Sequence, residues 1–356
     1  MKDAPLRAAV IGCGRMGVFT SEKVQRTAPA GWMPLSHADA LDSLDAYELV
    51  ALCDPDRDRL NEAGEKFSIS ARFTDHRELL GQVRPDVVTI ATRTDVRARI
   101  MRDAASAGVR GIHAEKPIAR SVKEWRETAA ELHRHNVKLT WGALRRWHET
   151  FRRAHEEVRR DETGAVREIS VEFGPGLLLW VHPHSVDLLI QFAGRRPVEV
   201  RAQCEIDRSA LKGDLLDQDP VVQWALVTFE NDTVGRIGTA AGMNLRIGCE
   251  NATVTVHGDG ASLERRLRSR VPGPYFSEYD EQTFAPQYSA AQRALLDLAQ
   301  AVHKNASTEV TSDEIEWGQR LLTGIVLSGL EEGRAIALDS IPEAFTITGR
   351  LGEMIA

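Results

Sequence analysis

The sequence predicts an α/β fold built from an N-terminal Rossmann dinucleotide-binding domain and a C-terminal α+β domain. Three observations support this prediction. Strand-like and helix-like segments alternate over residues 6–141, a glycine-rich turn follows the first strand, and short strand-like runs replace the alternation from Ala165 onward. The chain has 356 residues, enough for two domains that each bury a core. We place these domains at residues 1–142 and 143–356.

The first elements are a strand over residues 6–11, the turn GCGRMG and a helix over residues 18–26. In a G-x-G-x-x-G turn, the first glycine permits a tight bend, the second lets the backbone approach a pyrophosphate, and the third lets helix and strand pack closely. The helix N-terminus then faces the phosphates with unpaired N–H groups. This pattern predicts a dinucleotide site formed by Gly12, Gly14, Arg15, Met16 and Gly17.

The second strand, over residues 47–53, ends at Asp54, whose carboxylate could accept hydrogen bonds from both hydroxyls of an adenosine ribose. This position favours NAD over NADP as the cofactor. Two alternatives stay open. Asp54 could instead cap the helix that follows it, and Arg57 and Arg59 could bind the 2′-phosphate of NADP.

An extra segment over residues 27–46 separates the glycine turn from Asp54 by more than the usual distance of about 20 residues. It joins a helix end to a strand start. We therefore expect it at the edge of the sheet opposite to the ligand, where it would cover surface or contact another subunit.

The alternation continues through three more predicted pairs of a helix and a strand. The helices cover residues 76–83, 95–107 and 122–135, and the strands cover residues 86–90, 111–114 and 138–141. Such alternation builds a parallel sheet covered on both faces, with ligands outside the carboxyl ends of the strands.

Lys116 follows the strand over residues 111–114 at that carboxyl edge, in the segment HAEKPIA. Pro117 disfavours helical geometry at Lys116 and so keeps it in the loop. A lysine beside a cationic nicotinamide loses proton affinity, and burial acts in the same direction. Lys116 could then accept the proton of a substrate hydroxyl as hydride leaves the carbon. The alternative is an exposed loop lysine paired with Glu115.

From Ala165 the chain reads as strands over residues 165–173, 198–204, 221–229, 233–240 and 252–257, which predicts a mixed or antiparallel sheet. Within WVHPHSVDLLIQF, a helix that begins near Pro183 puts His184 and Asp187 on one face. His184 suits proton transfer, and Asp187 could fix its tautomer. Alternatively, His184 caps the helix or only packs.

The overall composition argues against several classes of protein. The net charge of −7 and the scattered arginines argue against a nucleic-acid surface. No apolar run approaches the roughly 20 residues of a membrane helix, and the first residues leave no room for a signal peptide. We therefore expect no membrane association and a cytoplasmic protein.

Metal and disulfide sites are not expected either. Cys13, Cys53, Cys204 and Cys249 lie far apart in sequence without CxxC spacing, so they read as reduced thiols. The histidines of the HPH segment, residues 182–184, lack an evident third ligand.

Four features together resemble the Gfo/Idh/MocA oxidoreductase family: GCGRMG, Asp54, Glu115-Lys116-Pro117, and His184 with Asp187 three residues later. The resemblance implies an open, largely antiparallel sheet in the second domain, hydride transfer at a sugar or cyclitol carbinol, and homodimers or homotetramers. It implies that Lys116 contacts both the substrate hydroxyl and the nicotinamide ribose, and that His184 acts as acid or base.

The resemblance also adds Thr92 and Glu115 to the cofactor site and Arg146 to the substrate site. Arg146 could hold a substrate hydroxyl or phosphate, with an exposed ion pair as the alternative. The chain departs from the family pattern at Trp180, where many members carry an aspartate. Trp180 could stack on a sugar ring or belong to the core.

These observations favour an NAD(P)-dependent dehydrogenase or reductase that acts on a sugar, a cyclitol or a related ring. Two other hypotheses remain. One is a non-catalytic dinucleotide-binding regulator on the same fold, since fold does not determine function. The other is a reductase of an imine or non-sugar ketone in a biosynthetic pathway.

Overall fold

The computed structural model describes residues 4–268 and 276–349. The chain forms two compact units. The first contains residues 1–28, 32–144 and 288–312, and the second contains residues 29–31, 145–287 and 313–356. The expected domains at 1–142 and 143–356 differ from these units in where they place residues 29–31, 143–144 and 288–312, and the division into domains remains a prediction.

The first unit is built on a six-stranded parallel sheet in the order β3-β2-β1-β4-β5-β6. Its strands are β1 Leu6–Ile11, β2 Tyr47–Cys53, β3 Arg72–Phe73, β4 Val87–Ile90, β5 Gly111–Ala114 and β6 Lys138–Trp141. Strands β4 and β5 are buried along their whole length, as expected for a parallel sheet covered on both faces. The chain order reverses between β1 and β4, and ligands bind at such switch points.

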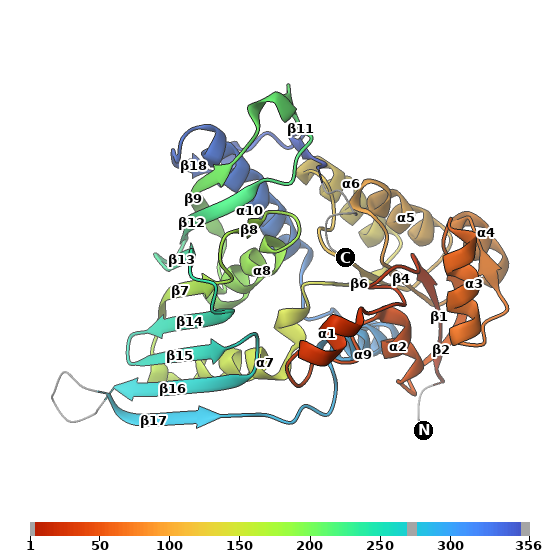
Figure 1. Ribbon diagram of the computed structural model, residues 1–356, viewed down its shortest axis with the longest axis horizontal. Coiled ribbons are helices and arrows are strands. Elements are labelled where there is room, and N and C mark those ends of the chain that lie inside the picture. The colour runs from red at the N-terminus through yellow and green to blue at the C-terminus, as the bar shows by residue number, and fades with distance from the viewer. Residues whose placement is uncertain (1–3, 269–275, 350–356) are drawn as a thin grey trace. The chain divides into compact units, whose positions relative to one another are not determined.

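Helices cover this sheet (Figure 1). They are α3 Arg57–Lys66, α4 His76–Val83, α5 Thr94–Ser106, α6 Val122–Arg134 and, from late in the chain, α9 Ala290–Lys304. Helix α9 lies close against β5, because a Cβ on Gly111 would meet Cγ2 of Val302 at 2.8 Å. The Tyr47 hydroxyl of β2 donates a 2.5 Å hydrogen bond to the carbonyl of Leu295. These contacts group α9 with the first unit.

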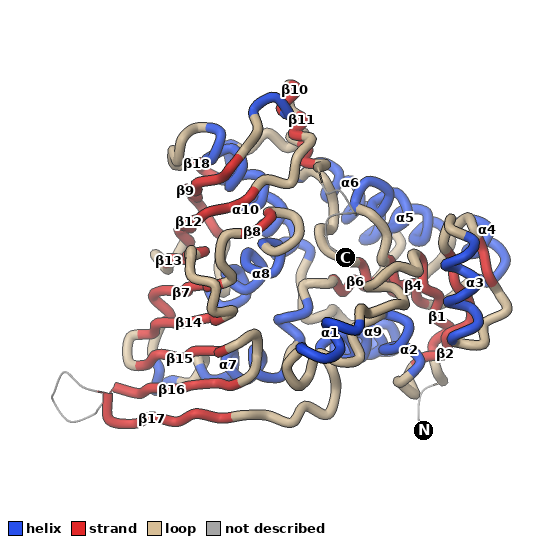
Figure 2. The backbone as a smooth tube through the Cα atoms, viewed as in Figure 1, coloured by secondary structure: helices blue, strands red, loops and turns tan. Residues whose placement is uncertain are grey.

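The first Rossmann helix differs from the prediction. The expected helix over residues 18–26 is wrong, since residues 15–18 form only a turn and α1 is the short helix Glu22–Thr27 with no buried residue. The helix resumes in α2, His37–Asp42. There the N–H groups of His37 and Ala38 donate to the carbonyls of Met16 (2.8 Å) and Gly17 (2.9 Å). Figure 2 shows α1 and α2 as separate helices joined by loop.

Residues 18–36 are therefore an insertion within the first helix. The expectation that residues 27–46 lie at the edge opposite to the ligand is wrong, because the chain leaves the helix directly after the glycine turn and returns to it at His37. Lys66 holds the start of the insertion, since its Nζ donates to the carbonyl of Val18 (3.1 Å) and to Oδ1 of Asp39 (2.8 Å).

The second unit contains a ten-stranded sheet in the order β17-β16-β15-β14-β7-β13-β12-β9-β18, with β8 paired to β12. Only β7 and β13 pair in parallel, so the sheet is largely antiparallel, as expected. Its strands are β7 Val166–Glu172, β8 Gly176–Leu177, β9 Pro197–Glu205, β12 Val221–Phe229, β13 Val234–Ile237, β14 Asn244–Cys249, β15 Ala252–His257, β16 Ser262–Arg268, β17 Phe276–Gln282 and β18 Ile336–Ala337.

One face of this sheet carries helices α7 Glu149–Glu157, α8 His182–Ala193 and α10 Ser312–Leu330 (Figure 1). Alternate residues such as Ile169 and Val171 of β7 point into the core beneath them. Short strands β10 Leu211–Lys212, β11 Leu215–Leu216 and β19 Thr346–Ile347 form a separate small sheet. Short 3₁₀ helices lie at Leu144–Trp147, Asp161–Thr163, Arg208–Ala210 and Leu338–Ser340.

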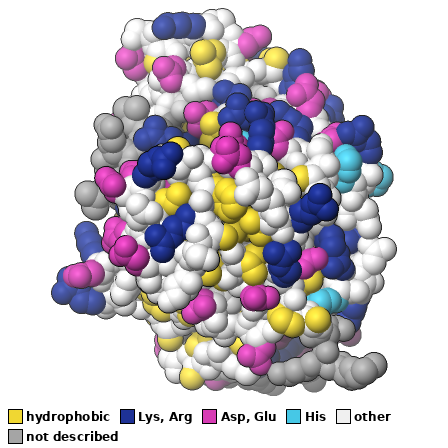
Figure 3. Space-filling model, turned by 90° about the vertical axis from the view of Figure 1, so that its right-hand side faces the viewer, with side chains coloured by type: hydrophobic (Ala, Val, Ile, Leu, Met, Phe, Trp, Pro, Cys, Tyr) yellow, Lys and Arg dark blue, Asp and Glu magenta, His cyan; other side chains and the backbone are white. Residues whose placement is uncertain are grey.

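Surface charges of both signs alternate. Figure 3 shows Lys and Arg side chains interspersed with Asp and Glu over the face that it displays. In the first unit, Nε of Arg77 lies 3.0 Å from Asp103, and Nη1 of Arg110 lies 3.3 Å from Asp86. All four cysteines are free thiols. No helix in the described part of the chain is long and apolar enough to cross a membrane.

Candidate functional site

The glycine turn has the geometry that its spacing predicts. Gly12 has φ of +98°, and a Cβ there would lie 2.8 Å from the backbone of Ala91 at the end of β4. A Cβ on Gly17 would lie 1.8 Å from the carbonyl oxygen of Gly12. A Cβ on Gly14 would meet nothing within 4 Å. Gly12 and Gly17 are thus required by packing, whereas Gly14 leaves open space of the kind that a pyrophosphate needs. Arg15 is exposed and Met16 is partly exposed beside this space.

Asp54 joins the end of β2 to the glycine turn. It is 3% exposed, and its Oδ2 accepts a 2.7 Å hydrogen bond from the N–H of Cys13. Its Oδ1 accepts from the N–H of Asp56 at 2.9 Å. The alternative that Asp54 caps the next helix is wrong, because Asp56 is the N-cap of α3. Nη1 of Arg59 lies 3.4 Å from Asp54, so a cation stands where the adenosine ribose is expected.

The loops after β4 and β5 are tied together by Arg97, a residue that sequence reasoning missed. Arg97 lies in α5 and is 1% exposed. Its guanidinium donates to the carbonyls of Thr92 and Pro117. A charged residue in an amphipathic helix is normally predicted to lie on the solvent-exposed face. The two carbonyls, one of them 20 residues away in the loop after β5, stabilise the buried guanidinium.

Lys116 and Glu115 are both buried, with 7% and 5% exposure. The alternative of an exposed loop lysine is therefore wrong. The N–H of Lys116 donates to Oε2 of Glu115 at 3.2 Å, and the N–H of Glu115 donates to the carbonyl of Ile90 at 2.9 Å. The Lys116–Pro117 peptide bond is cis. The backbone of this segment is thus anchored to β4, with the lysine directly after β5.

Two buried histidines surround Glu115, and both were missed in the sequence. Nε2 of His37 lies 3.4 Å from Oε1 of Glu115. The ring of His113 packs edge-on against His37 at a centroid distance of 4.8 Å. Burial raises the pKa of Glu115, but the hydrogen bond from His37 and three nearby positive charges outweigh it and lower the pKa to about 2. Burial, helped by the charge of His37, lowers the pKa of His113 to about 3.

In the second unit, His184 lies in the first turn of α8. Val181 occupies the N-cap position and Pro183 lies in the first turn, so the alternative that His184 caps the helix is wrong. His184 and Trp180 are both partly exposed, which excludes Trp180 from the buried core. The segment before the helix is held by the N–H of Leu179, which donates to Oδ1 of Asp219 at 2.7 Å.

Asp187 forms a buried ion pair with Arg146. The two side chains are each 3% exposed. Nε of Arg146 donates to both carboxylate oxygens at 3.1 Å, and its Nη2 donates to Oδ1 at 2.6 Å. Nη2 also lies 3.5 Å from Glu314 of α10. Burial lowers the pKa of Arg146, but the two carboxylates outweigh it and raise the pKa. The alternative of an exposed ion pair at Arg146 is therefore wrong.

The structure thus brings together several residues chosen from the sequence. The glycine turn meets Asp54, Thr92 is joined to the loop of Lys116 through Arg97, and Asp187 meets Arg146. Lys116 belongs to the first unit and His184 to the second. Their convergence on one substrate, and the orientation of His184 by Asp187, remain predictions.

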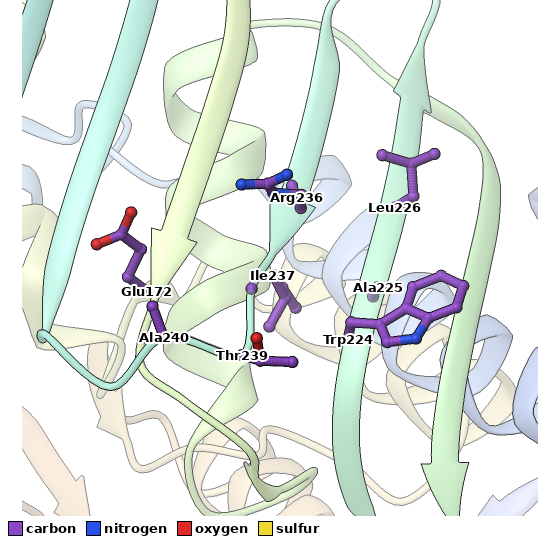
Figure 4. A pocket seen from close by; sticks show the side chains of 9 residues that line it. Glu172, Trp224, Ala225, Leu226, Arg236, Ile237, Thr239 and Ala240 are labelled. Atoms are coloured by element: carbon purple, nitrogen blue, oxygen red, sulfur yellow. The ribbon is translucent and has the colours of Figure 1, made fainter.

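A separate pocket of about 410 Å³ lies on the ten-stranded sheet of the second unit. Glu172, Trp224, Leu226, Arg236 and Thr239 are among its lining residues, and they come from β7, β12, β13 and the chain after β13 (Figure 4). None of the residues expected to bind cofactor or substrate lines it. Over residues 4–268 and 276–349, no three His, Cys, Asp or Glu side chains gather as a metal site would require.

Among the curated proteins with sequence similarity to this chain are two dehydrogenases. D-apiose dehydrogenase of Paraburkholderia graminis is 31% identical over 134 residues, which are 38% of this chain and 36% of that protein. Myo-inositol 2-dehydrogenase of Thermotoga maritima is 26% identical over 245 residues, which are 65% of this chain and 67% of that protein. The match with the first of these relatives thus covers only 36% of the length of that protein.

Solved structures resemble the chain over almost its full length. A levoglucosan dehydrogenase in complex with NADH and levoglucosan has a TM-score of 0.74 at 14% identity, covering 94% of this chain and 99% of that one. An aldose-aldose oxidoreductase from Caulobacter crescentus has a TM-score of 0.74 at 18% identity, with the same coverage of both chains. The TM-scores establish a shared fold, and at identities this low the likeness shows the fold alone.

Residues 6–143 match a family model described as an oxidoreductase family with an NAD-binding Rossmann fold. The matched range contains the glycine turn, Asp54, Arg97 and the Glu115-Lys116 pair, whose geometry agrees with a dinucleotide site. The match confirms the Rossmann fold and the expectation of NAD. Over residues 6–143, the chain matches the Gfo/Idh/MocA family of oxidoreductases.

Proposed function

We propose that this protein transfers hydride between NAD and a ring carbinol, or the corresponding ketone, of a sugar, cyclitol or sugar derivative. The observation that carries the proposal is Lys116. It is a buried lysine directly after β5, and its loop is tied by Arg97 to the loop after β4 at the switch point of the sheet. The relatives named above as D-apiose and myo-inositol dehydrogenases support a polyol or sugar substrate.

The cofactor would be held by residues of the first unit. The open space at Gly14 fits a pyrophosphate, with Arg15 and Met16 beside it. Asp54 would accept hydrogen bonds from the adenosine ribose, and Thr92, Glu115 and Lys116 would line the nicotinamide end. Arg59 beside Asp54 keeps NADP as an alternative cofactor. When bound, NAD supplies the hydride acceptor in oxidation and the donor in reduction.

The protein side chains would manage the proton and the substrate. In oxidation, the substrate hydroxyl loses its proton to neutral Lys116 or to neutral His184 while the carbon loses hydride. In reduction, the same group returns the proton to the oxygen. Asp187 would orient His184, Trp180 would offer a ring face to the sugar, and Arg146 would bind substrate or hold Asp187 in place.

The proposed function includes a proposed oligomeric state. We propose that the protein acts as a homodimer or homotetramer on a small-molecule substrate in the cytoplasm. Light scattering of the purified full chain measures the subunit number. A monomer at the concentrations used for catalysis would contradict the oligomer.

The test of function is a substrate screen with purified protein. NAD⁺ or NADP⁺ is mixed with D-apiose, myo-inositol, levoglucosan and a panel of other sugars and cyclitols, and reduced cofactor is followed by absorbance. We expect turnover with a ring polyol in the wild type, a fall of about 10²-fold or more in Lys116→Met, and no change in Lys123→Met, which alters an exposed lysine of α6.

Three results would contradict the proposal in different ways. NADH binding without turnover of any substrate, in either direction, would support the regulator instead. Turnover of cyclic imines or non-sugar ketones, but of no polyol, would support the biosynthetic reductase. Full activity in Lys116→Met would remove the lysine from the reaction.

A further inference from the structure

His37 stands where the first Rossmann helix resumes after the insertion. Its N–H donates to the carbonyl of Met16 at 2.8 Å, so its backbone is fixed to the glycine turn. Its side chain is 1% exposed and directed to the other part of the cofactor site, with Nε2 at 3.4 Å from Oε1 of Glu115. One residue thus touches both the turn expected to hold the pyrophosphate and the acid beside Lys116.

Glu115 has little freedom to move away from this contact. A Cβ added to Gly142 would lie 2.7 Å from Oε1 and 2.9 Å from Oε2 of Glu115, so the carboxylate lies directly against the backbone after β6. Its Oε2 accepts from the N–H of Lys116 at 3.2 Å. The carboxylate is therefore enclosed by Gly142, by His37 and by the backbone of the lysine itself.

Three side chains that can carry a positive charge lie near the Glu115 carboxylate. Lys116, Arg97 and His37 lower its pKa. His113, which packs edge-on against His37, has its pKa lowered to about 3 by burial and stays neutral at ordinary pH. Glu115 is thus a fixed anion behind the lysine, and His37 is the donor that holds one of its oxygens in the protein interior.

We propose that His37 is a positioning residue that fixes Glu115, and through it Lys116, relative to the glycine turn. The proposal rests on the proposed role of Lys116 in proton transfer. It gives a structural role to the return of the chain after the insertion, because the helix resumes at a residue that contacts both loops. A displacement of Lys116 by about 1 Å is enough to reduce a rate by about 10²-fold.

The experiment uses the full chain with His37→Leu, His37→Gln, Glu115→Gln and the double variant His37→Leu/Glu115→Gln. Leucine removes the donor, while glutamine keeps an N–H donor near Nε2. His133→Gln alters an exposed histidine at the end of α6 and is the matched control. The measurements are kcat and KM with the substrate from the screen, NADH affinity by fluorescence, and NMR of the ¹³C-methylated lysines.

We expect His37→Leu to lower kcat by about 10-fold or more with KM and NADH affinity changed less than threefold. His37→Gln should recover most of the loss, and His133→Gln should match the wild type. The double variant should be no slower than Glu115→Gln alone, because His37 acts through Glu115. Equal losses in kcat and NADH affinity, or additive losses in the double variant, would overturn the proposal.

The NMR readout separates this proposal from the proposed function. The chain has only eight lysines, and Lys116→Arg identifies the resonance of Lys116. Removal of the anion in Glu115→Gln should lower the pH at which Lys116 titrates, and His37→Leu should shift its resonance even if no substrate is turned over. An unchanged Lys116 resonance in both variants would overturn the coupling, whereas full activity in Lys116→Met would overturn only the proposed function. If His37→Leu does not fold, Glu115→Gln tests the same contact from the other side.

Discussion

Arg146 and Asp187 form a buried ion pair joined by three hydrogen bonds of 2.6 to 3.1 Å. The arginine comes from the 3₁₀ helix Leu144–Trp147 and the aspartate from the middle of α8, so the pair ties the start of the second unit to the helix that carries His184. Removal of one partner from a buried pair strongly destabilises the fold, because the remaining charge stays buried without its counter-ion.

Arg146→Met should therefore destabilise the protein by about 3–5 kcal/mol. Arg146→Lys keeps the charge but loses the forked geometry, and a smaller loss is expected. Urea unfolding of each variant measures the free energy. The double variant Arg146→Met/Asp187→Leu removes both charges and should recover much of the stability. A double variant as unstable as the sum of the two single ones would contradict the argument.

The glycine turn offers a contrast between two substitutions. Gly17→Ala would put a Cβ 1.8 Å from the carbonyl oxygen of Gly12. We therefore expect the variant either not to fold or to lose about 3 kcal/mol or more of its free energy of unfolding. Gly14→Ala meets no atom within 4 Å and should fold with near wild-type stability, but bind NADH at least about tenfold more weakly because the methyl group enters the pyrophosphate space.

Circular dichroism melting and NADH fluorescence titration measure the two effects separately. Gly81→Ala in α4, where a Cβ also meets nothing within 4 Å, is the control. It should raise stability by about 0.5–1 kcal/mol through helix propensity and leave NADH binding unchanged. Wild-type NADH affinity in Gly14→Ala would place the dinucleotide elsewhere.

Acid should weaken the fold through His113. Burial lowers its pKa from 6.5 to about 3, so the folded state holds it neutral while the unfolded state binds a proton below about pH 6.5. The free energy of unfolding therefore falls as the pH drops from 6.5 toward 3, by up to about 1.4 kcal/mol per pH unit for each such group. Glu115, with its pKa near 2, adds a loss of stability in the same direction below about pH 4.5.

His113→Asn should reduce this pH dependence, because an asparagine amide does not titrate. The amide can take the place of Nδ1, which lies 3.0 Å from the Thr140 hydroxyl. Urea unfolding at a series of pH values gives the slope. His155 and His182, whose pKa values burial lowers to about 4, contribute a similar slope that remains in this variant. The exposed His133→Asn should leave the slope unchanged, and an unchanged slope in His113→Asn would contradict the assignment.

Arg97→Met should loosen both loops at the cofactor site. Its guanidinium holds the carbonyls of Thr92 and Pro117, and the variant leaves both without this donor. We expect a stability loss of about 1–3 kcal/mol and weaker NADH binding, measured by urea unfolding and fluorescence titration. Arg99→Met, on an exposed position of the same helix, is the control. Wild-type NADH affinity in Arg97→Met would show that the loops keep their positions without it.

Much of the first unit is readable from local pattern. The alternation of apolar runs and helical periods predicts five of the six parallel strands, all except the two-residue β3, and the order observed is the one that such winding produces. The spacing of Gly12, Gly14 and Gly17 predicts which glycines are packed and which is open, because the neighbours of Gly12 and Gly17 lie in the turn itself or at the end of β4, whereas Gly14 has none. The position of Lys116 after β5 follows from the same winding.

Other features required the tertiary structure. The insertion that breaks the first helix cannot be located from periodicity, because residues 18–26 have a helical pattern although the hydrogen bonds of the helix pass to residues 37 and 38. The burial of Arg97 depends on carbonyls from two other loops, and the pairing of Arg146 with Asp187 joins residues 41 positions apart.

The amino-acid sequence by itself thus determined the order of strands and helices, the glycine turn and the edge of the sheet at which Lys116 lies. These depend on side-chain periodicity and turn chemistry, which act between near neighbours in the chain. Only the tertiary structure decided which charges are buried together and where His37 returns to the helix. Such contacts depend on packing between distant segments, which leaves no periodic signal in the sequence.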